Sequence, residues 1–352
     1  MSNKKKGTIY GLLSGFTWAI NALLLYNVLD LFIAGQGYPD SFVGWMFIIV
    51  CALVIAFVDS CLAFITELGI LIKMKKFGEF WRTLFSKDSL AVLPAAICSG
   101  LFGAVPYILA SSYNSPLTLT LTTVFPAIGA IVAVIWFKEK LTKFKFLGII
   151  ITIVGVAVMT GFGDVVPWYI YMIALVPAFG YAFEGLFGYN AMRADIHPEV
   201  TTVMRRVYFI VLFSVMIIVG SIFTRDFRYV IDLIASFEVN NEAFPFLTGL
   251  VGNRAVIWII LFIGSAGSAF SYALWYFSMS YGGVGTAQAL NITYSGFLVL
   301  FLALPPFSQI PGLGMVIGVL VILIGAVIVS YETIKTDGKP KSTTSDSTPN
   351  PK

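Results

Sequence analysis

Long apolar runs separated by short polar segments dominate the chain. One run, residues 126–137, reads PAIGAIVAVIWF without a charge and stops at Lys138-Glu139-Lys140. A membrane-spanning helix needs about 20 mostly apolar residues, and these runs lack the alternation of barrel strands. They therefore predict transmembrane helices. Ten spans are expected, at residues 7–29, 42–64, 90–112, 117–137, 146–162, 168–192, 200–223, 255–279, 285–304 and 312–331.

Composition supports lipid as the solvent of this chain. Hydrophobic residues make up 58% of it, charged residues only 11%, and the mean hydropathy is +0.90. A soluble domain carries about 25% charged residues, so we predict an all-α membrane protein in contact with a lipid bilayer. The tail, residues 335–352, is rich in Ser, Thr and Pro and is predicted to be disordered and cytoplasmic.

Lysine and arginine predict the orientation. With ten spans both termini share one side, and placing that side in the cytoplasm puts 19 of the 22 basic residues inside. The outer segments then keep Arg225, Arg228 and Arg254. This asymmetry follows the positive-inside rule and predicts a multi-pass cell-membrane protein with both termini cytoplasmic. The net charge of +4 is explained without a nucleic-acid partner.

The chain contains an internal repeat. GIIITIVGVAV at residues 148–158 aligns with GVLVILIGAVI at 318–328, and FTWAINALL at 16–24 aligns with FGYAFEGLF at 179–187. Each half then holds five helices, and an odd number places the halves in opposite orientations. Inverted repeats of this kind are typical of secondary transporters. Duplication for stability alone is the alternative.

A family resemblance follows from the end of the predicted fourth span. Pro126, Glu139, Leu141-Thr142 and the pair Gly148 and Gly155 resemble the half-repeat of EamA-like proteins in the drug/metabolite transporter superfamily. The resemblance implies a first EamA-like repeat over 7–162 and a second over 168–332. The second half departs from the pattern, with Gly296 for the proline, Gln309 for the glutamate, and Pro305-Pro306 within the run.

Glu184 is the most informative single residue. It lies deep in the predicted sixth span, where an ionisable group is costly unless it is paired or faces a wet cavity. We expect it to bind substrate, with Asn21, its repeat counterpart, lining the same cavity. A proton is the candidate coupling ion. A carboxylate that is merely satisfied by a neighbouring helix is the alternative.

Other charged residues occupy or flank the predicted spans. Arg205 and Arg206 either snorkel to the inner interface, or one of them faces the cavity and meets a substrate carboxylate or Glu184. Asp59 lies either in the cavity or near the inner exit. Glu67 is expected in a cytoplasmic extension of the second helix. Glu139 is expected to fix its helix end with neighbouring lysines.

Aromatic side chains in mid-span complete the candidate substrate site. Trp18, Tyr181 and Tyr272 either line a pocket or pack within the bundle, and Tyr107, Tyr113 and Tyr294 are secondary candidates. Two further segments, 77–85 and 227–237, show apolar residues at helical spacing and predict amphipathic interfacial helices.

The motifs exclude several classes of function. No GxxxxGK[ST] loop occurs, so ATP hydrolysis is not expected. Neither a catalytic constellation nor a metal cluster is present, so we expect no enzyme activity and no cofactor. We predict a secondary transporter for a small metabolite, with amino-acid export favoured. A sugar or nucleotide-sugar importer or exchanger is the alternative, followed by a non-transporting membrane receptor or an intramembrane enzyme.

Overall fold

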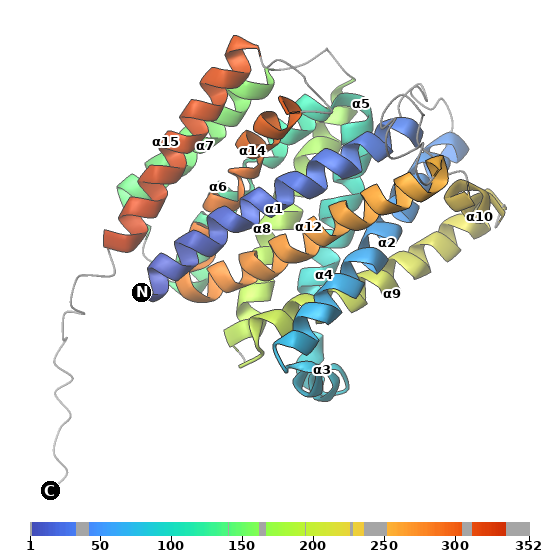
Figure 1. Ribbon diagram of the computed structural model, residues 1–352, viewed down its shortest axis with the longest axis horizontal. Helices are drawn as coiled ribbons and strands as arrows, with labels where there is room; N and C mark the ends of the chain where they lie inside the picture. Colours follow the sequence, from blue (N-terminus) through green and yellow to red (C-terminus); the bar gives the residue numbers. More distant parts are fainter. Residues whose placement is uncertain are drawn as a thin grey trace, which may run out of the picture.

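The computed structural model describes residues 2–32, 42–139, 141–161, 167–193, 195–225, 228–235, 252–304 and 312–335, and within these ranges the regular structure is helical (Figure 1). The predicted tail beyond residue 335, Lys140, Pro305-Pro306 and Gln309 lie outside the described residues. The α-helices are α1 (Asn3–Phe32), α2 (Phe42–Lys73), α3 (Phe77–Leu84), α4 (Leu93–Ser99), α5 (Val105–Thr122), α6 (Phe125–Phe137), α7 (Lys143–Thr160), α8 (Trp168–Arg193), α9 (Pro198–Thr224), α10 (Arg228–Ala235), α12 (Asn253–Gly282), α13 (Val284–Asn291), α14 (Tyr294–Leu302) and α15 (Leu313–Lys335). A 3₁₀ turn, η1 (Lys87–Ala91), precedes α4, and a π-helical turn, η2 (Gly100–Ala104), joins α4 to α5.

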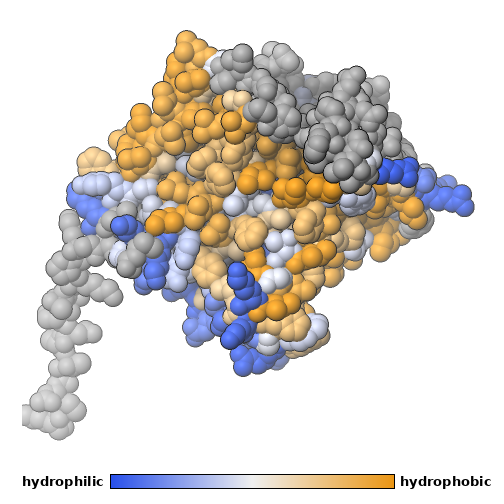
Figure 2. Space-filling model, in the orientation of Figure 1, coloured by the Kyte–Doolittle hydropathy of each residue, from blue (hydrophilic) through white to orange (hydrophobic). Residues whose placement is uncertain are grey.

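The bundle has the apolar surface of a membrane protein. Among the described residues, seven helical segments are long and apolar enough to cross a membrane. Figure 2 shows apolar side chains over much of the visible face, with hydrophilic ones along the lower edge from the N-terminus to α3 and in a smaller group beside α10. The all-α membrane class is therefore confirmed, whereas the count of ten spans stays a prediction.

Two span boundaries differ from those predicted. Residues 113–116 were expected to separate the third and fourth spans, but α5 runs through them to Thr122. The break comes instead at residues 123–124, and Pro126 lies in the first turn of α6, where a proline costs no helical hydrogen bond. A second break, at residues 292–293, divides the predicted ninth span into α13 and α14.

Close helix pairs build the bundle. The most extensive packing joins α1 to α12, α7 to α15, α2 to α9 and α5 to α8, and Figure 1 shows α7 and α15 side by side at one edge. A Cβ added to Gly155 would lie 2.7 Å from the Ile322 nitrogen, and one added to Gly148 would lie 3.0 Å from the Gly325 oxygen. Only glycine permits this approach of α7 to α15.

Two short amphipathic helices lie at different ends of the bundle (Figure 1). In α3, Phe80 is buried while Phe77 and Trp81 are exposed, as expected for a helix at the edge of a membrane. The predicted helix at 77–85 is thus found as α3, and α10 is the described part of the one expected at 227–237.

Candidate functional site

A buried ion pair joins Glu184 on α8 to Arg205 on α9. Both side chains are fully buried, and Arg205 Nη1 lies 2.9 Å from Glu184 Oε1. The Tyr272 hydroxyl donates to Glu184 Oε2 over 3.4 Å, and the guanidinium stacks on the Tyr272 ring, 3.6 Å from its centroid. Of the two alternatives for Arg205, the contact with Glu184 is the one observed.

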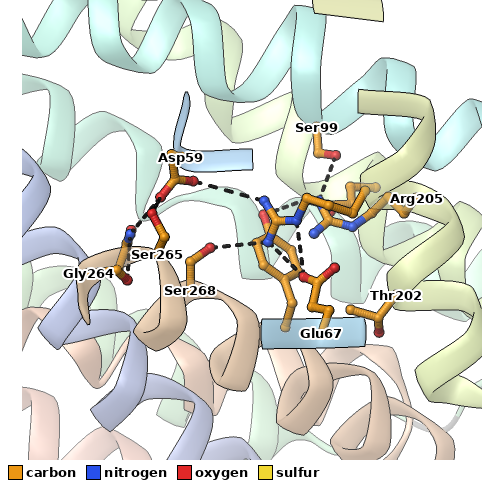
Figure 3. Close-up of polar contacts among 12 residues, drawn as sticks. Asp59, Glu67, Ser99, Thr202, Arg205, Gly264, Ser265 and Ser268 are labelled. Carbon is orange, nitrogen blue, oxygen red and sulfur yellow. Dashed lines mark hydrogen bonds and ion pairs between the residues drawn. The ribbon is translucent and has the colours of Figure 1, made fainter. Parts of the chain in front are cut away.

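Arg206, the next residue, enters a second buried network. Its Nε and Nη2 donate to Glu67 Oε1 over 3.0 and 2.8 Å, and Nη2 also reaches Ser268 Oγ at 3.3 Å. Its Nη1 lies 3.9 Å from Asp59 Oδ2. Figure 3 shows Glu67 and Asp59 on different sides of this cluster.

This network bears on two expectations from the sequence. Glu67, expected in a cytoplasmic extension of the second helix, has its side chain fully buried against Arg206, and its place relative to the membrane stays a prediction. Neither arginine snorkels, since both are buried within the bundle. Arg205 and Arg206 are therefore subtracted from the basic residues counted at the inner surface.

Asp59 and Asn21 join α2 to α1 and α12. Asn21 Nδ2 donates to Asp59 Oδ1 over 3.2 Å and to the Gly264 oxygen over 3.0 Å. The Ser265 hydroxyl donates to the same Asp59 oxygen over 2.8 Å. These bonds fix the carboxylate of Asp59 at the wall of a cavity, where its side chain keeps 14% exposure.

Two neighbouring cavities lie among these groups. The first comprises about 460 Å³ of space between atoms, part of it open to solvent, and is lined by Glu184 and by aromatic rings. The second comprises about 640 Å³ of such space and is lined by Asn21, Asp59 and Arg206. Trp18, Tyr107, Tyr181 and Tyr272 line both. Seven of the eight substrate-binding candidates thus border a cavity, and Arg205 borders neither. Their role in substrate binding stays a prediction.

The structure adds residues that the sequence did not single out. Thr122, Phe125, Ser271, Trp275 and Asn291 also line the first cavity. Of the secondary candidates, Tyr107 and Tyr294 line it, whereas Tyr113 packs against Trp45, with ring centroids 5.9 Å apart.

Glutamate spacing carried a signal that was missed. Glu67 lies eight residues after Asp59 on α2, and Glu199 lies seven residues before Arg206 on α9. Residues seven or eight apart share one face of a helix. Both glutamates are fully buried.

Glu139 makes a contact that the sequence did not predict. The helix α6 ends at Phe137, and Lys138 adopts a left-handed conformation with φ of 55°. Glu139 Oε1 then accepts the N–H of Val284, at the start of α13, over 3.0 Å. The carboxylate therefore caps a helix of the second half rather than only anchoring its own.

Outside the spans, a small polar cluster ties α3 to the start of α9. Lys76 Nζ lies 2.7 Å from Glu79 Oε2, and the His197 N–H donates to Glu79 Oε1 over 3.3 Å. Partial burial alone would raise the pKa of Glu79, but the bonds from Lys76 and His197 outweigh it and lower that pKa. Burial, followed by the charge of Lys76, lowers the pKa of His197.

Comparisons with known proteins bear on the whole arrangement. The chain is similar to a solved protein described only as "Crystal structure of protein", with a TM-score of 0.63 and 14% identity over 94% of this chain and 98% of that one. At this identity the likeness shows a shared fold alone. No curated protein matches the chain significantly.

The family comparison tests the resemblance seen in the sequence. Residues 5–161 match the model of the EamA-like transporter family, which belongs to the drug/metabolite transporter superfamily and is not an enzyme family. The match covers the first expected repeat, where Pro126, Glu139, Gly148 and Gly155 lie. The expected resemblance is therefore confirmed: residues 5–161 of this membrane protein match the EamA-like transporter family.

Proposed function

We propose that the protein is a secondary transporter that moves a small metabolite across the cell membrane by alternating access. One observation carries the proposal. Glu184 lines a cavity deep in the bundle, is fully buried and is paired with Arg205. An ionisable group at such depth marks a substrate or ion pathway in membrane proteins.

We further propose that residues 7–162 and 168–332 form two inverted five-helix repeats. The packing of helices supports this. Under the sequence repeat, α8 is equivalent to α1, and α4 with α5 is equivalent to α12. The contact of α1 with α12 is matched by the contact of α8 with α4 and α5. The helix α7 packs on its own counterpart α15. A two-fold axis between inverted halves would produce this pattern, and it would let each half serve as the gate for one side.

The glycines at the contact of α7 with α15 follow the same symmetry. Gly148 approaches Gly325, and Gly155 approaches Gly318. Under the sequence repeat Gly148 corresponds to Gly318, and Gly155 corresponds to Gly325. Exchanging the two halves therefore turns the contact of Gly148 with Gly325 into the contact of Gly318 with Gly155. With an even number of spans both termini would lie on one side, and the excess of basic residues there would place that side, with the tail at 335–352, in the cytoplasm.

Amino-acid export is the substrate assignment that we favour. A zwitterion carries an ammonium group and a carboxylate. Glu184 at the first cavity offers the charge opposite to the ammonium group, and its partner Arg205, which borders neither cavity, would have to turn toward the cavity to meet the carboxylate. Arg205 Nε and Nη2 have no hydrogen-bond partner among the described residues. The rings of Trp18, Tyr181 and Tyr272 would enclose the remainder of the molecule.

A sugar-nucleotide substrate ranks lower. A diphosphate requires several cationic side chains in its site. Among the described residues that line the two cavities, Arg206 supplies the cationic charge. Its guanidinium group is already hydrogen-bonded to Glu67.

A thermal-shift panel tests the proposal. Purified protein in detergent is unfolded with amino acids, sugars, nucleotides and cationic drugs at several pH values, for the wild type, Glu184→Gln and the control Asp88→Asn, which alters an exposed carboxylate. A ligand at ten times its dissociation constant adds about 1.4 kcal/mol. We expect one class to stabilise the wild type and the control but not Glu184→Gln. Stabilisation by no class, or equal stabilisation of Glu184→Gln, would contradict the proposed site.

A further inference from the structure

Two buried glutamates lie beyond the cavities, at the ends of α2 and α9 that adjoin α3. Glu67 and Glu199 are both fully buried. Neither carboxylate oxygen of Glu199 has a hydrogen-bond partner in the part of the chain that the structure describes, and the same holds for Glu67 Oε2. Unsatisfied buried carboxylate oxygens are costly, so these atoms point to a ligand that the protein atoms do not supply.

The two glutamates belong to one row of charged side chains. Asp59 and Glu67 lie on one face of α2, and Glu199 and Arg206 lie on the facing side of α9. Arg206 contacts both Asp59 and Glu67. The negative charge of Glu67 is near enough to Glu199 to repel a charge there. The row therefore runs from the second cavity, which Asp59 and Arg206 line, to Glu199 in the first turn of α9.

Within the described part of the chain, the groups nearby do not supply Glu199 with a cation. Thr202 lies beside Glu67 in Figure 3, but its hydroxyl donates to the Pro198 carbonyl over 3.0 Å. At the start of α9, His197 Nδ1 accepts the backbone N–H of Glu199 over 3.3 Å. The ammonium group of Lys76 on α3 is paired with Glu79.

Counting charges shows what the row lacks. The carboxylates of Asp59, Glu67, Glu184 and Glu199 face the guanidinium groups of Arg205 and Arg206. Arg205 is paired with Glu184, and Arg206 is shared between Glu67 and Asp59. The charges near Glu67 are those of Arg206, Arg205 and Asp59, and the charge near Glu199 is that of Glu67. A buried carboxylate that has no cation and lies near a second carboxylate is more stable in its neutral form.

We propose that Glu199, next to the pair of Glu67 and Arg206, binds a proton and forms a proton-binding site distinct from Glu184. The proton neutralises a buried carboxylate whose oxygens have no partner among the described residues. Its loss leaves both glutamates charged, so that they compete for Arg206 and draw the guanidinium away from Asp59 at the cavity wall. The proton site rests on the burial and the unpartnered oxygens of Glu199, and it does not depend on transport. Its use as the coupling site of transport rests on the proposed function.

The pH dependence of stability tests the site without a substrate. The unfolded chain releases this proton near the ordinary glutamate value of about 4.3, whereas the folded chain holds it above that value. Stability must therefore fall as pH rises from about 4.3 to the pH at which the folded chain loses the proton, by up to about tenfold in the folding equilibrium constant per pH unit, and it must level off above that pH. Full-length protein is unfolded thermally in detergent, in sodium-free buffers from about pH 5 to alkaline pH. We expect Glu199→Gln, which keeps the shape without ionising, to remove this loss, and the control Asp88→Asn to retain it.

Infrared spectroscopy reads the same proton directly. A protonated carboxylic acid has a carbonyl stretch that a carboxylate lacks. We expect this band at neutral pH in the wild type and in Asp88→Asn, and its loss in Glu199→Gln. The proposal is overturned if Glu199→Gln keeps the band and the wild-type pH slope, or if the wild type shows no such band.

A metal ion is the competing source of positive charge. Sodium that stabilises the wild type but not Glu199→Gln, at constant ionic strength, would also overturn the proposal. None of these readouts requires transport, so failure of the proton site and failure of the transporter assignment give different results.

Discussion

Replacing Arg206 by methionine isolates the energy of the buried charge network. The wild-type fork donates to Glu67 Oε1 over 3.0 and 2.8 Å and is 2% exposed. Methionine fills much of the space of the stem but leaves Glu67 and Asp59 buried without their cation. Breaking a buried pair on one side costs about 3–5 kcal/mol. We therefore expect Arg206→Met to lower the free energy of unfolding by about this amount.

An exposed ion pair in the same protein supplies the control. Lys76 and Glu79 lie 2.7 Å apart, with side chains 35% and 21% exposed, and water screening limits such a pair to about 0.2–1 kcal/mol. Lys76→Met should therefore cost far less than Arg206→Met. Adding Glu67→Leu to Arg206→Met should recover much of the loss, since an apolar replacement of a whole buried pair is close to neutral.

Equilibrium unfolding in mixed micelles of mild and denaturing detergent measures all four proteins. The result that would refute the reasoning is a cost for Arg206→Met no larger than that for Lys76→Met. The arginine fork would then be solvated, and the contact with Glu67 would not be a buried pair.

Three further predictions concern packing, capping and pH. Gly155→Ala should destabilise the protein by about 1–3 kcal/mol because its Cβ would strike the backbone of α15, whereas Gly78→Ala, with no atom within 4 Å of the new Cβ, should be neutral or stabilising. Equal midpoints of thermal unfolding would contradict this. Glu139→Ala removes the acceptor at the start of α13 and should cost about 0.5–2 kcal/mol, while an unchanged midpoint would show that water caps this helix. Since the pKa values of His197 and Glu79 are lowered in the folded protein, acidification should weaken the contact of α3 with α9, first below about pH 6.5 and again below about pH 4.5. Hydrogen exchange of α3 that does not change with pH, after correction for intrinsic rates, would argue against it.

The membrane class was predictable because composition and long apolar runs depend on sequence alone. The helix boundaries were less so. The polar stretch SSYNSP at residues 111–116 was interpreted as a loop, yet α5 passes through it, because packing overrides local propensity. The break at residues 123–124 lies in a Thr-Val stretch that resembles the rest of the run.

The candidate site was predicted in part. Glu184 was conspicuous because a charge inside an apolar run is expensive wherever the helix packs. The burial of Glu67 was not predicted because it depends on the register of α2 against α9, which brings Arg206 opposite it. A single chain read along its length does not give that register. Arg205 was recognised as a partner of Glu184 only as one alternative, for the same reason.

Solute flux in sealed proteoliposomes tests the central claim, that this protein is a transporter, most directly. The solute is the class that stabilises the purified wild type, and the comparison is with Glu184→Gln and Asp88→Asn. The account predicts saturable accumulation of labelled solute by counterflow for the wild type and Asp88→Asn, with loss for Glu184→Gln. Binding of the solute without movement across the bilayer would contradict it and identify a receptor.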